Sequence, residues 1–124
     1  MSKKIIVING YMASGKSAFA VRLSQAINVP YFLKDTFKMA ICTTVSLNNQ
    51  PESSHFSAIT FNAMMYVAER LMEKEFPLIL EGNFVPAGLK KVDEAGVIKT
   101  LIEKHNYHSL LFKFMLEYSS RTVA

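Results

Sequence analysis

The sequence GYMASGKS at residues 10–17 is a complete match to the pattern G-x-x-x-x-G-K-[ST]. It follows an apolar run, residues 5–8, that favours a buried β-strand, and it precedes a segment with helical periodicity. Glycines at such a bend let successive backbone N–H groups converge on phosphate oxygens. The first turn of the following helix adds unpaired N–H groups and the positive end of the helix dipole. The motif therefore predicts a site for a nucleoside triphosphate.

Two side chains of this motif have distinct expected roles. Lys16 supplies a cation for the β- and γ-phosphates, and Ser17 Oγ is a ligand for Mg²⁺. The alternative is a β-to-α turn that binds nothing, but the four fixed positions of the motif would then have to match the pattern by coincidence. The full set of expected nucleotide-binding residues is Gly10, Ala13, Ser14, Gly15, Lys16, Ser17 and Ala18.

Strand and helix patterns alternate along the chain, which is typical of a three-layer α/β domain with a parallel sheet. The expected strands cover about residues 4–9, 31–33, 78–80 and 109–116. The expected helices cover about residues 15–27, 36–46 (fraying into a loop), 57–75 and 90–104. Residues 46–54 are polar and aperiodic, and we expect a mobile loop there. Apolar positions expected to face the sheet are Phe19, Leu23 and Ile27 in the first helix and Phe61, Met64, Met65, Ala68, Leu71 and Met72 in the third.

Composition limits the function classes. The chain has 124 residues, of which 50% are hydrophobic, so we expect one domain, residues 1–124, with a real core. The net charge of +4 comes from scattered lysines, which suits anionic small molecules better than nucleic acid. We expect no membrane partner, because no apolar stretch is long enough to span a bilayer and no cleavable signal precedes the first strand. The single cysteine, Cys42, excludes an internal disulfide and suits a cytoplasmic protein.

Polar residues follow the second and third expected strands. Asp35 follows the second strand, with Lys38 one helical turn later, and Glu81 and Asn83 follow the third. Ligands of such sheets bind beyond the carboxyl ends of the strands, so these residues are candidates for the site. A glutamate that ends an apolar strand needs a cationic partner, and Lys16 or Mg²⁺ would supply it.

Three segments of the chain resemble small P-loop kinase families: the predicted ATP-binding kinases of the AAA-33 type, chloramphenicol phosphotransferase and zeta toxins and, more distantly, shikimate and gluconate kinases. The segments are residues 10–17, 32–38 and 80–84. The resemblance implies a sheet of order 2-3-1-4-5. It also implies that Asp35 contacts the acceptor and takes its hydroxyl proton, and that Glu81 is a Walker-B-like carboxylate.

The resemblance makes Lys16, Asp35 and Glu81 the expected catalytic residues, and Asp35, Lys38 and Asn83 the expected substrate contacts. Each acceptor-side residue has a structural alternative. Asp35 favours the N-cap of a helix that starts at Thr36, Lys38 could be a solvated helix lysine, and Asn83 suits a turn. His105 and His108 are three residues apart but straddle the end of the fourth expected helix, so we do not expect them to bind a metal.

The chain departs from these families at its end. Related kinases continue with an arginine-bearing lid helix and a fifth strand whose following loop holds adenine, whereas here the sequence reaches Ala124 with Arg121 as the one arginine near the expected lid. A missing fifth strand would leave residues 110–116 as an apolar edge, which predicts either a homo-oligomer through the fourth strand or a fragment of a longer kinase. The sequence thus favours an ATP- and Mg²⁺-dependent kinase with a hydroxyl acceptor. The alternative is a catalytically impaired nucleotide-binding module.

Overall fold

The computed structural model describes residues 2–11, 14–43, 52–85 and 92–115. For residues 52–55 it describes the backbone but not the side chains. Its centre is a parallel sheet of four strands in the order β2-β3-β1-β4. The strands are β1 (Lys4–Gly10), β2 (Tyr31–Leu33), β3 (Leu78–Gly82) and β4 (His108–Phe114). This confirms the predicted α/β class and the strand order 2-3-1-4.

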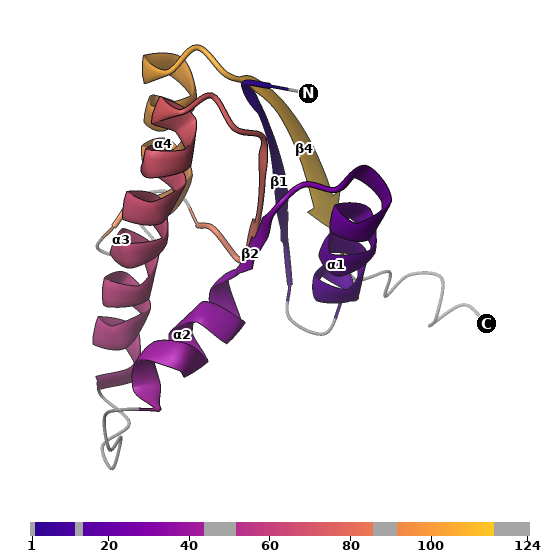
Figure 1. The fold of residues 1–124 in the computed structure, drawn as a ribbon. Helices are drawn as coiled ribbons and strands as arrows, with labels where there is room; N and C mark the ends of the chain where they lie inside the picture. The colour runs from indigo at the N-terminus through magenta and orange to yellow at the C-terminus, as the bar shows by residue number, and fades with distance from the viewer. Residues whose placement is uncertain (1, 12–13, 44–51, 86–91, 116–124) are drawn as a thin grey trace, which may run out of the picture.

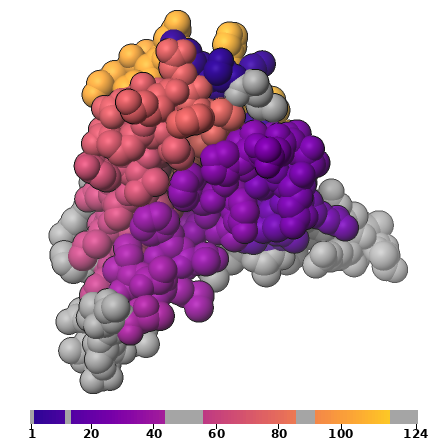
Figure 2. All heavy atoms as spheres, in the orientation of Figure 1, coloured from indigo at the N-terminus to yellow at the C-terminus, as the bar shows by residue number. Residues whose placement is uncertain are grey.

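In the described ranges, four helices connect and cover the strands: α1 (Lys16–Ile27), α2 (Lys34–Cys42), α3 (Glu52–Glu73) and α4 (Glu94–Lys104). Helix α1 lies on one face of the sheet, and α3 and α4 lie on the other (Figure 1). The arrowhead of β4 marks the carboxyl edge of the sheet, and α1 and α2 begin at that edge. Helix α2 continues outward from there and lies against α3 at the lower end of the molecule (Figure 2).

The core has two parts, one on each face of the sheet. Side chains alternate along a strand, so Leu78 and Leu80 of β3 pack with α3 and α4, whereas Ile79 packs with α1. The predicted stripe of α3 is buried at Phe61, Met64, Met65, Ala68 and Met72, with Leu71 packed against it. The predicted stripe of α1, residues Phe19, Leu23 and Ile27, also contacts the core. The sheet-facing periodicity of both helices is therefore confirmed.

Several expected boundaries are wrong. Helix α2 begins at Lys34, and its N-cap is Leu33, so Asp35 lies in the first turn and is not the cap. Residues 52–54, expected in a loop, form the first turn of α3, while residues 44–51 lie outside the described residues. Helix α4 begins at Glu94, because the Asp93 carboxylate accepts a hydrogen bond from the backbone N–H of Gly96 and caps the helix there.

Strand β4 is an edge of the sheet and exposes apolar side chains. Leu110 is 54% exposed and Leu111 is 62% exposed, although Phe112 and Phe114 of the same strand pack on Phe19 of α1. Within the described parts of the chain, no helix combines the length and the apolar character needed to cross a membrane.

Candidate functional site

The phosphate-binding motif and the end of β3 meet through Lys16 and Glu81. Lys16 is the first residue of α1, and its Nζ lies 4.0 Å from Glu81 Oε2. Glu81 lies two residues after Ile79 in β3, so its side chain points to the same face as Ile79, toward α1. Lys16 is only 5% exposed and Glu81 only 2%. The buried carboxylate thus has the cationic neighbour that its burial requires.

Ser17 makes the shortest polar contact of this site. Its Oγ donates a hydrogen bond of 2.5 Å to Glu81 Oε2. On the other side of the loop, Lys16 Nζ donates to the carbonyl oxygen of Tyr11 at 3.3 Å, and Ser14 Oγ donates to the same oxygen at 2.6 Å. These contacts bring the two described ends of the loop together over the carboxyl end of β1.

Two glycines permit this geometry for different reasons. Gly15 is the N-cap of α1 with φ 88°, a left-handed conformation, and an added Cβ would meet no atom of the described residues within 4 Å. Gly10 has φ 152°, and an added Cβ would lie 2.4 Å from the carbonyl oxygen of Phe114. Gly15 therefore supplies the left-handed bend into α1, whereas Gly10 lets β4 pass close to the start of the loop.

The other described residues predicted to bind nucleotide lie at the two ends of the loop. Ser14, Gly15, Lys16, Ser17 and Ala18 are contiguous at the start of α1, where the first N–H groups of a helix have no partner within it. Gly10 ends β1, while Ala13 lies outside the described residues.

The chemistry of Ser17 and Glu81 fits a magnesium ion. Both side chains present oxygen, the ligand that Mg²⁺ prefers, and they lie within hydrogen-bonding distance of each other. Among the described residues, no group of three or more His, Cys, Asp or Glu side chains gathers into a metal site. The pair of Ser17 and Glu81 suits Mg²⁺, because this ion is usually held by one or two protein groups together with phosphate oxygens and water.

The predicted acceptor-side residues lie at the same edge of the sheet. Leu33, the last residue of β2, pairs with Glu81 in the β2–β3 register, so β2 and β3 end side by side. Asp35 is exposed in the first turn of α2, Lys38 is half-buried one turn later, and Asn83 is exposed directly after β3. Within the described part of the chain, no hydrogen bond or ion pair joins Asp35 to Lys16, Ser17 or Glu81. The structure thus brings Lys16, Ser17 and Glu81 into contact and leaves Asp35 accessible beside them.

The sequence analysis did not identify a buried ion pair near this edge. Lys34 Nζ lies 2.7 Å from Glu94 Oε2, and the two residues are 5% and 1% exposed. It also did not identify Asn9, whose side-chain amide joins the end of β1 to the residue after Asn83. In the sequence analysis Lys34 directly follows the second expected strand, but nothing singles out Glu94, which lies inside the helix expected over residues 90–104.

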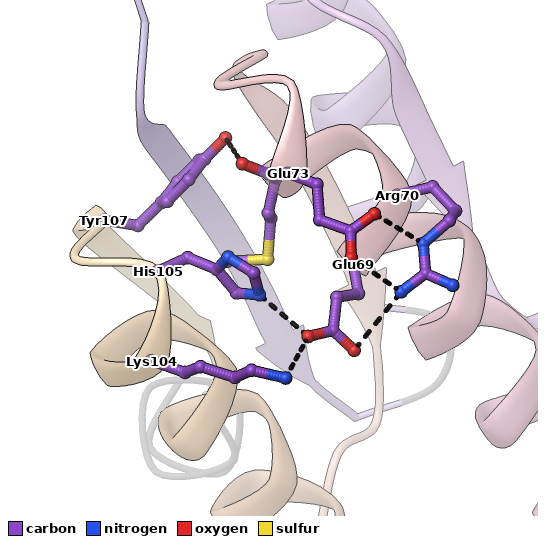
Figure 3. Close-up of polar contacts among 7 residues, drawn as sticks. Glu69, Arg70, Glu73, Lys104, His105 and Tyr107 are labelled. Carbon is purple, nitrogen blue, oxygen red and sulfur yellow. Dashed lines mark hydrogen bonds and ion pairs between the residues drawn. The ribbon is translucent and has the colours of Figure 1, made fainter.

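A second polar cluster joins α3 to the end of α4, away from the carboxyl edge of the sheet (Figure 3). Glu69 Oε2 lies 2.8 Å from both Lys104 Nζ and His105 Nε2. The hydrogen bond with Lys104, and to a smaller extent that with His105, lowers the pKa of the Glu69 carboxyl to about 2. Arg70 also approaches Glu69 and pairs with Glu73. His105 thus belongs to an inter-helix ion-pair cluster.

Comparisons with known proteins identify the fold. No protein-family model matches the chain, and no curated protein matches its sequence. A candidate kinase from Chloroflexus aurantiacus has a similar structure, with a TM-score of 0.81 and 18% identity over 92% of this chain and 60% of that one. A gluconokinase from Sinorhizobium meliloti gives a TM-score of 0.55 and 16% identity over 95% and 61% of the two chains. An APS kinase from Mycobacterium tuberculosis gives a TM-score of 0.59 and 12% identity over 92% of this chain and 76% of that one.

The chain spans about three fifths of the length of the first two of these structures. The identities are too low to extend the likeness beyond the fold, so assignment to the AAA-33 type stays a prediction. The strand order, the helices on both faces and these structural similarities agree with one another. The chain has a P-loop kinase-like fold.

Proposed function

We propose that the protein binds ATP with Mg²⁺ and transfers the γ-phosphoryl group to a hydroxyl group of a small acceptor. The observation that carries this proposal is the contact between the phosphate-binding motif and the end of β3. Lys16 and Ser17, the two motif residues expected to contact phosphate and Mg²⁺ through their side chains, both approach one buried carboxylate oxygen, Glu81 Oε2. A turn that merely joined a strand to a helix would have no need for a buried cation and a buried anion at this position.

The phosphate groups are held by the start of α1. Its first backbone N–H groups and its dipole attract the anionic oxygens, and Gly15 has no side chain in their way. Among the described residues, the polar neighbours of Lys16 Nζ are a carbonyl oxygen at 3.3 Å and a carboxylate oxygen at 4.0 Å, so it can turn toward a phosphate at little cost. These groups orient the triphosphate and offset its charge.

Glu81 and Ser17 are the residues that would hold Mg²⁺. When bound, this ion neutralises the charge that develops on the phosphate oxygens during transfer. Ser17 would present its oxygen to the ion in place of its hydrogen bond to Glu81. Glu81 would orient the water or hydroxyl groups around the bound ion.

Asp35 is the residue that orients the acceptor. Its carboxylate is exposed at the start of α2, next to the strand end that carries Glu81. In the transfer, the bond between the γ-phosphorus and the bridging oxygen breaks, and a bond from the acceptor oxygen to that phosphorus forms. The acceptor proton moves to the Asp35 carboxylate, and the products are ADP and a phosphate monoester. Lys38 and Asn83 are proposed to contact the acceptor from the same edge.

The proposal is tested by measuring ADP formation from ATP–Mg²⁺ with a panel of sugars, sugar acids, nucleosides and aminoglycosides. A kinase forms ADP at least about tenfold faster with one acceptor than with water, and a phosphate monoester of that acceptor appears in equal amount. Binding of ATP–Mg²⁺ without transfer to any acceptor class would contradict the transfer activity while leaving nucleotide binding intact.

That second outcome is the one expected of a nucleotide-binding module without transfer activity. One observation favours it: within the described ranges, the arginines are Arg22 and Arg70, on α1 and near the end of α3, and neither follows the carboxyl end of a strand. Arginine is the residue that most often stabilises the charge of a transferring phosphoryl group. The acceptor panel separates the two functions directly.

A further inference from the structure

Three polar side chains connect the phosphate-binding loop with the acceptor side of the site. They are Asn9 at the end of β1, Lys34 at the start of α2 and Glu94 at the start of α4. Asn9 and Glu94 form hydrogen bonds with the backbone of residues 84–85, which follow β3, and Lys34 pairs with Glu94. We call these three side chains, together with the backbone of residues 84–85, the positioning network.

Asn9 forms the first half of this network. Its Oδ1 accepts hydrogen bonds from the backbone N–H of Gly10 at 2.8 Å and of Phe84 at 2.9 Å. Its Nδ2 donates to the carbonyl oxygen of Phe84 at 2.9 Å. The amide thus holds both backbone groups of Phe84 and, at the same time, the first residue of the phosphate-binding loop. This continues the β1–β3 pairing beyond the last paired residues of the strands.

The buried ion pair forms the second half. Glu94 Oε1 accepts a hydrogen bond from the backbone N–H of Val85 at 3.3 Å, and Glu94 Oε2 accepts one from Lys34 Nζ at 2.7 Å. Lys34 Nζ also lies 5.9 Å from the centre of the Phe61 ring. Both charges are almost completely buried, so the pair is held in one arrangement by the cost of separating it.

A continuous chain of contacts therefore joins the phosphate-binding loop to the acceptor side of the site. It runs from Gly10 through Asn9 to residues 84–85, and from there through Glu94 to Lys34, the neighbour of Asp35. Asn83, the other exposed acceptor-side candidate, directly precedes the held segment. A buried ion pair is often no more stabilising than apolar residues of the same shape, so stability alone does not account for charges here.

We propose that the positioning network couples nucleotide binding at the phosphate-binding loop to the placement of Asp35, so that α2 becomes more ordered when the nucleotide is bound. This rests on the proposed nucleotide binding and adds three positioning residues to it. Asn9, Lys34 and Glu94 act through the backbone of residues 84–85 and of α2. They do not touch the substrates.

The test is amide hydrogen exchange, followed in peptides from residues 14–20 and 34–42, with and without saturating ADP–Mg²⁺. In the unaltered protein, ADP–Mg²⁺ should slow exchange by at least about fivefold in both segments. The double variant Lys34→Met/Glu94→Leu removes the pair without leaving an unpaired buried charge. In this variant residues 14–20 should keep their protection, and the slowing in residues 34–42 should fall below about twofold.

The matched control is Lys104→Met/Glu69→Leu. It makes the same two substitutions in an ion pair of 2.8 Å that also joins α4 to another element, but at the other end of α4. This variant should behave like the unaltered protein in both segments. Lys34→Arg, which keeps the charge, should retain at least part of the nucleotide-dependent protection of residues 34–42.

Asn9→Ala breaks the network at its other end and provides an independent test if the double variant does not fold. It too should lose the nucleotide-dependent protection of residues 34–42. Full nucleotide-dependent protection of residues 34–42 in either variant would overturn the proposal. So would an unaltered protein in which the nucleotide protects residues 14–20 but not residues 34–42. That last result would leave nucleotide binding intact, whereas a lack of protection in both segments would overturn nucleotide binding as well.

Discussion

Ser17 Oγ donates a 2.5 Å hydrogen bond to Glu81 Oε2, although the two residues are 64 positions apart in the sequence. The contact joins the second residue of α1 to the end of β3, across the face of the sheet that α1 covers. A hydroxyl and a carboxylate at this spacing can exchange their mutual hydrogen bond for a shared cation. Nucleotide binding and metal binding are therefore expected to depend on each other.

Replacing Asp35 by asparagine should abolish transfer and spare binding. The variant keeps the shape of the side chain but cannot take the acceptor proton, so the turnover number should fall by at least about 100-fold. The dissociation constant for ATP–Mg²⁺, measured by calorimetry, should stay within about twofold, because Asp35 makes no contact with Lys16 or Ser17.

The control for this variant is Asp93→Asn, the same substitution at the start of α4. Asparagine caps helices as well as aspartate does, so turnover and stability should both stay close to those of the unaltered protein. Equal losses of turnover and ATP affinity in Asp35→Asn would contradict the assigned role.

The two glycines of the loop should differ in their tolerance of alanine. Gly10→Ala places a Cβ against the backbone of Phe114, which a side-chain rotation cannot relieve, so the free energy of unfolding should fall by at least about 2 kcal/mol. Gly15→Ala meets no neighbour and should cost only about 1 kcal/mol through its left-handed backbone conformation. Denaturant unfolding without nucleotide measures both. The reverse order would show that β4 does not pass as close to Gly10 as the structure indicates.

The Glu69 cluster should make stability depend on acidic pH. The pKa of the Glu69 carboxyl is about 2 in the folded protein and about 4.5 in the unfolded chain. The folded state therefore gains stability from this group above pH 4.5, and it loses that gain as the pH falls toward 2.

The gain should be no more than about 1 kcal/mol, because solvent screens these side chains. Glu69→Gln should reduce the slope of unfolding free energy against pH between 4.5 and 2, whereas Glu103→Gln, at an exposed position on α4, should leave it unchanged. An unchanged slope in Glu69→Gln would show that Lys104 and His105 do not hold its charge.

The exposed apolar edge of β4 should cause self-association. Among the described residues, β1 is the one strand that pairs with β4, so the other edge of β4 and the side chains of Leu110 and Leu111 together offer a second copy a strand to pair with. Light scattering should show a mass that rises with protein concentration, and Leu111→Lys should restore the mass of a monomer. Phe76→Lys, at another exposed apolar position, should not. A monomeric mass at all concentrations would refute association through this edge.

The sequence was sufficient to predict the parts of the fold that depend on local patterns. Each strand is a short apolar run, and the phosphate-binding motif fixes where β1 ends and α1 begins. Helix boundaries were less accurate, because Leu33 caps α2 without a polar side chain and Asp35 suggested a later start. The polar residues 52–54 read as a loop, since the first turn of a long helix needs no apolar face.

Contacts between distant residues could not be predicted from local patterns. Lys34 and Glu94 are 60 positions apart, and Asn9 and Phe84 are 75 apart. Each contact depends on how far a strand extends and on which face of the sheet a side chain lies. A shift of the strand register by one residue would move the side chain to the opposite face. Glu81 was the exception, because a carboxylate at the end of an apolar strand already requires a partner.

The central claim, that the start of α1 and Lys16 bind a triphosphate, is tested most directly by calorimetric titration of ATP–Mg²⁺. The unaltered protein should bind one equivalent, and Lys16→Met should bind at least about tenfold more weakly, as expected for the loss of a charged hydrogen bond. Lys99→Met, at an exposed position of α4, should bind as the unaltered protein does. A titration of the folded, unaltered protein that shows no heat of binding, or equal affinities for all three proteins, would contradict the claim.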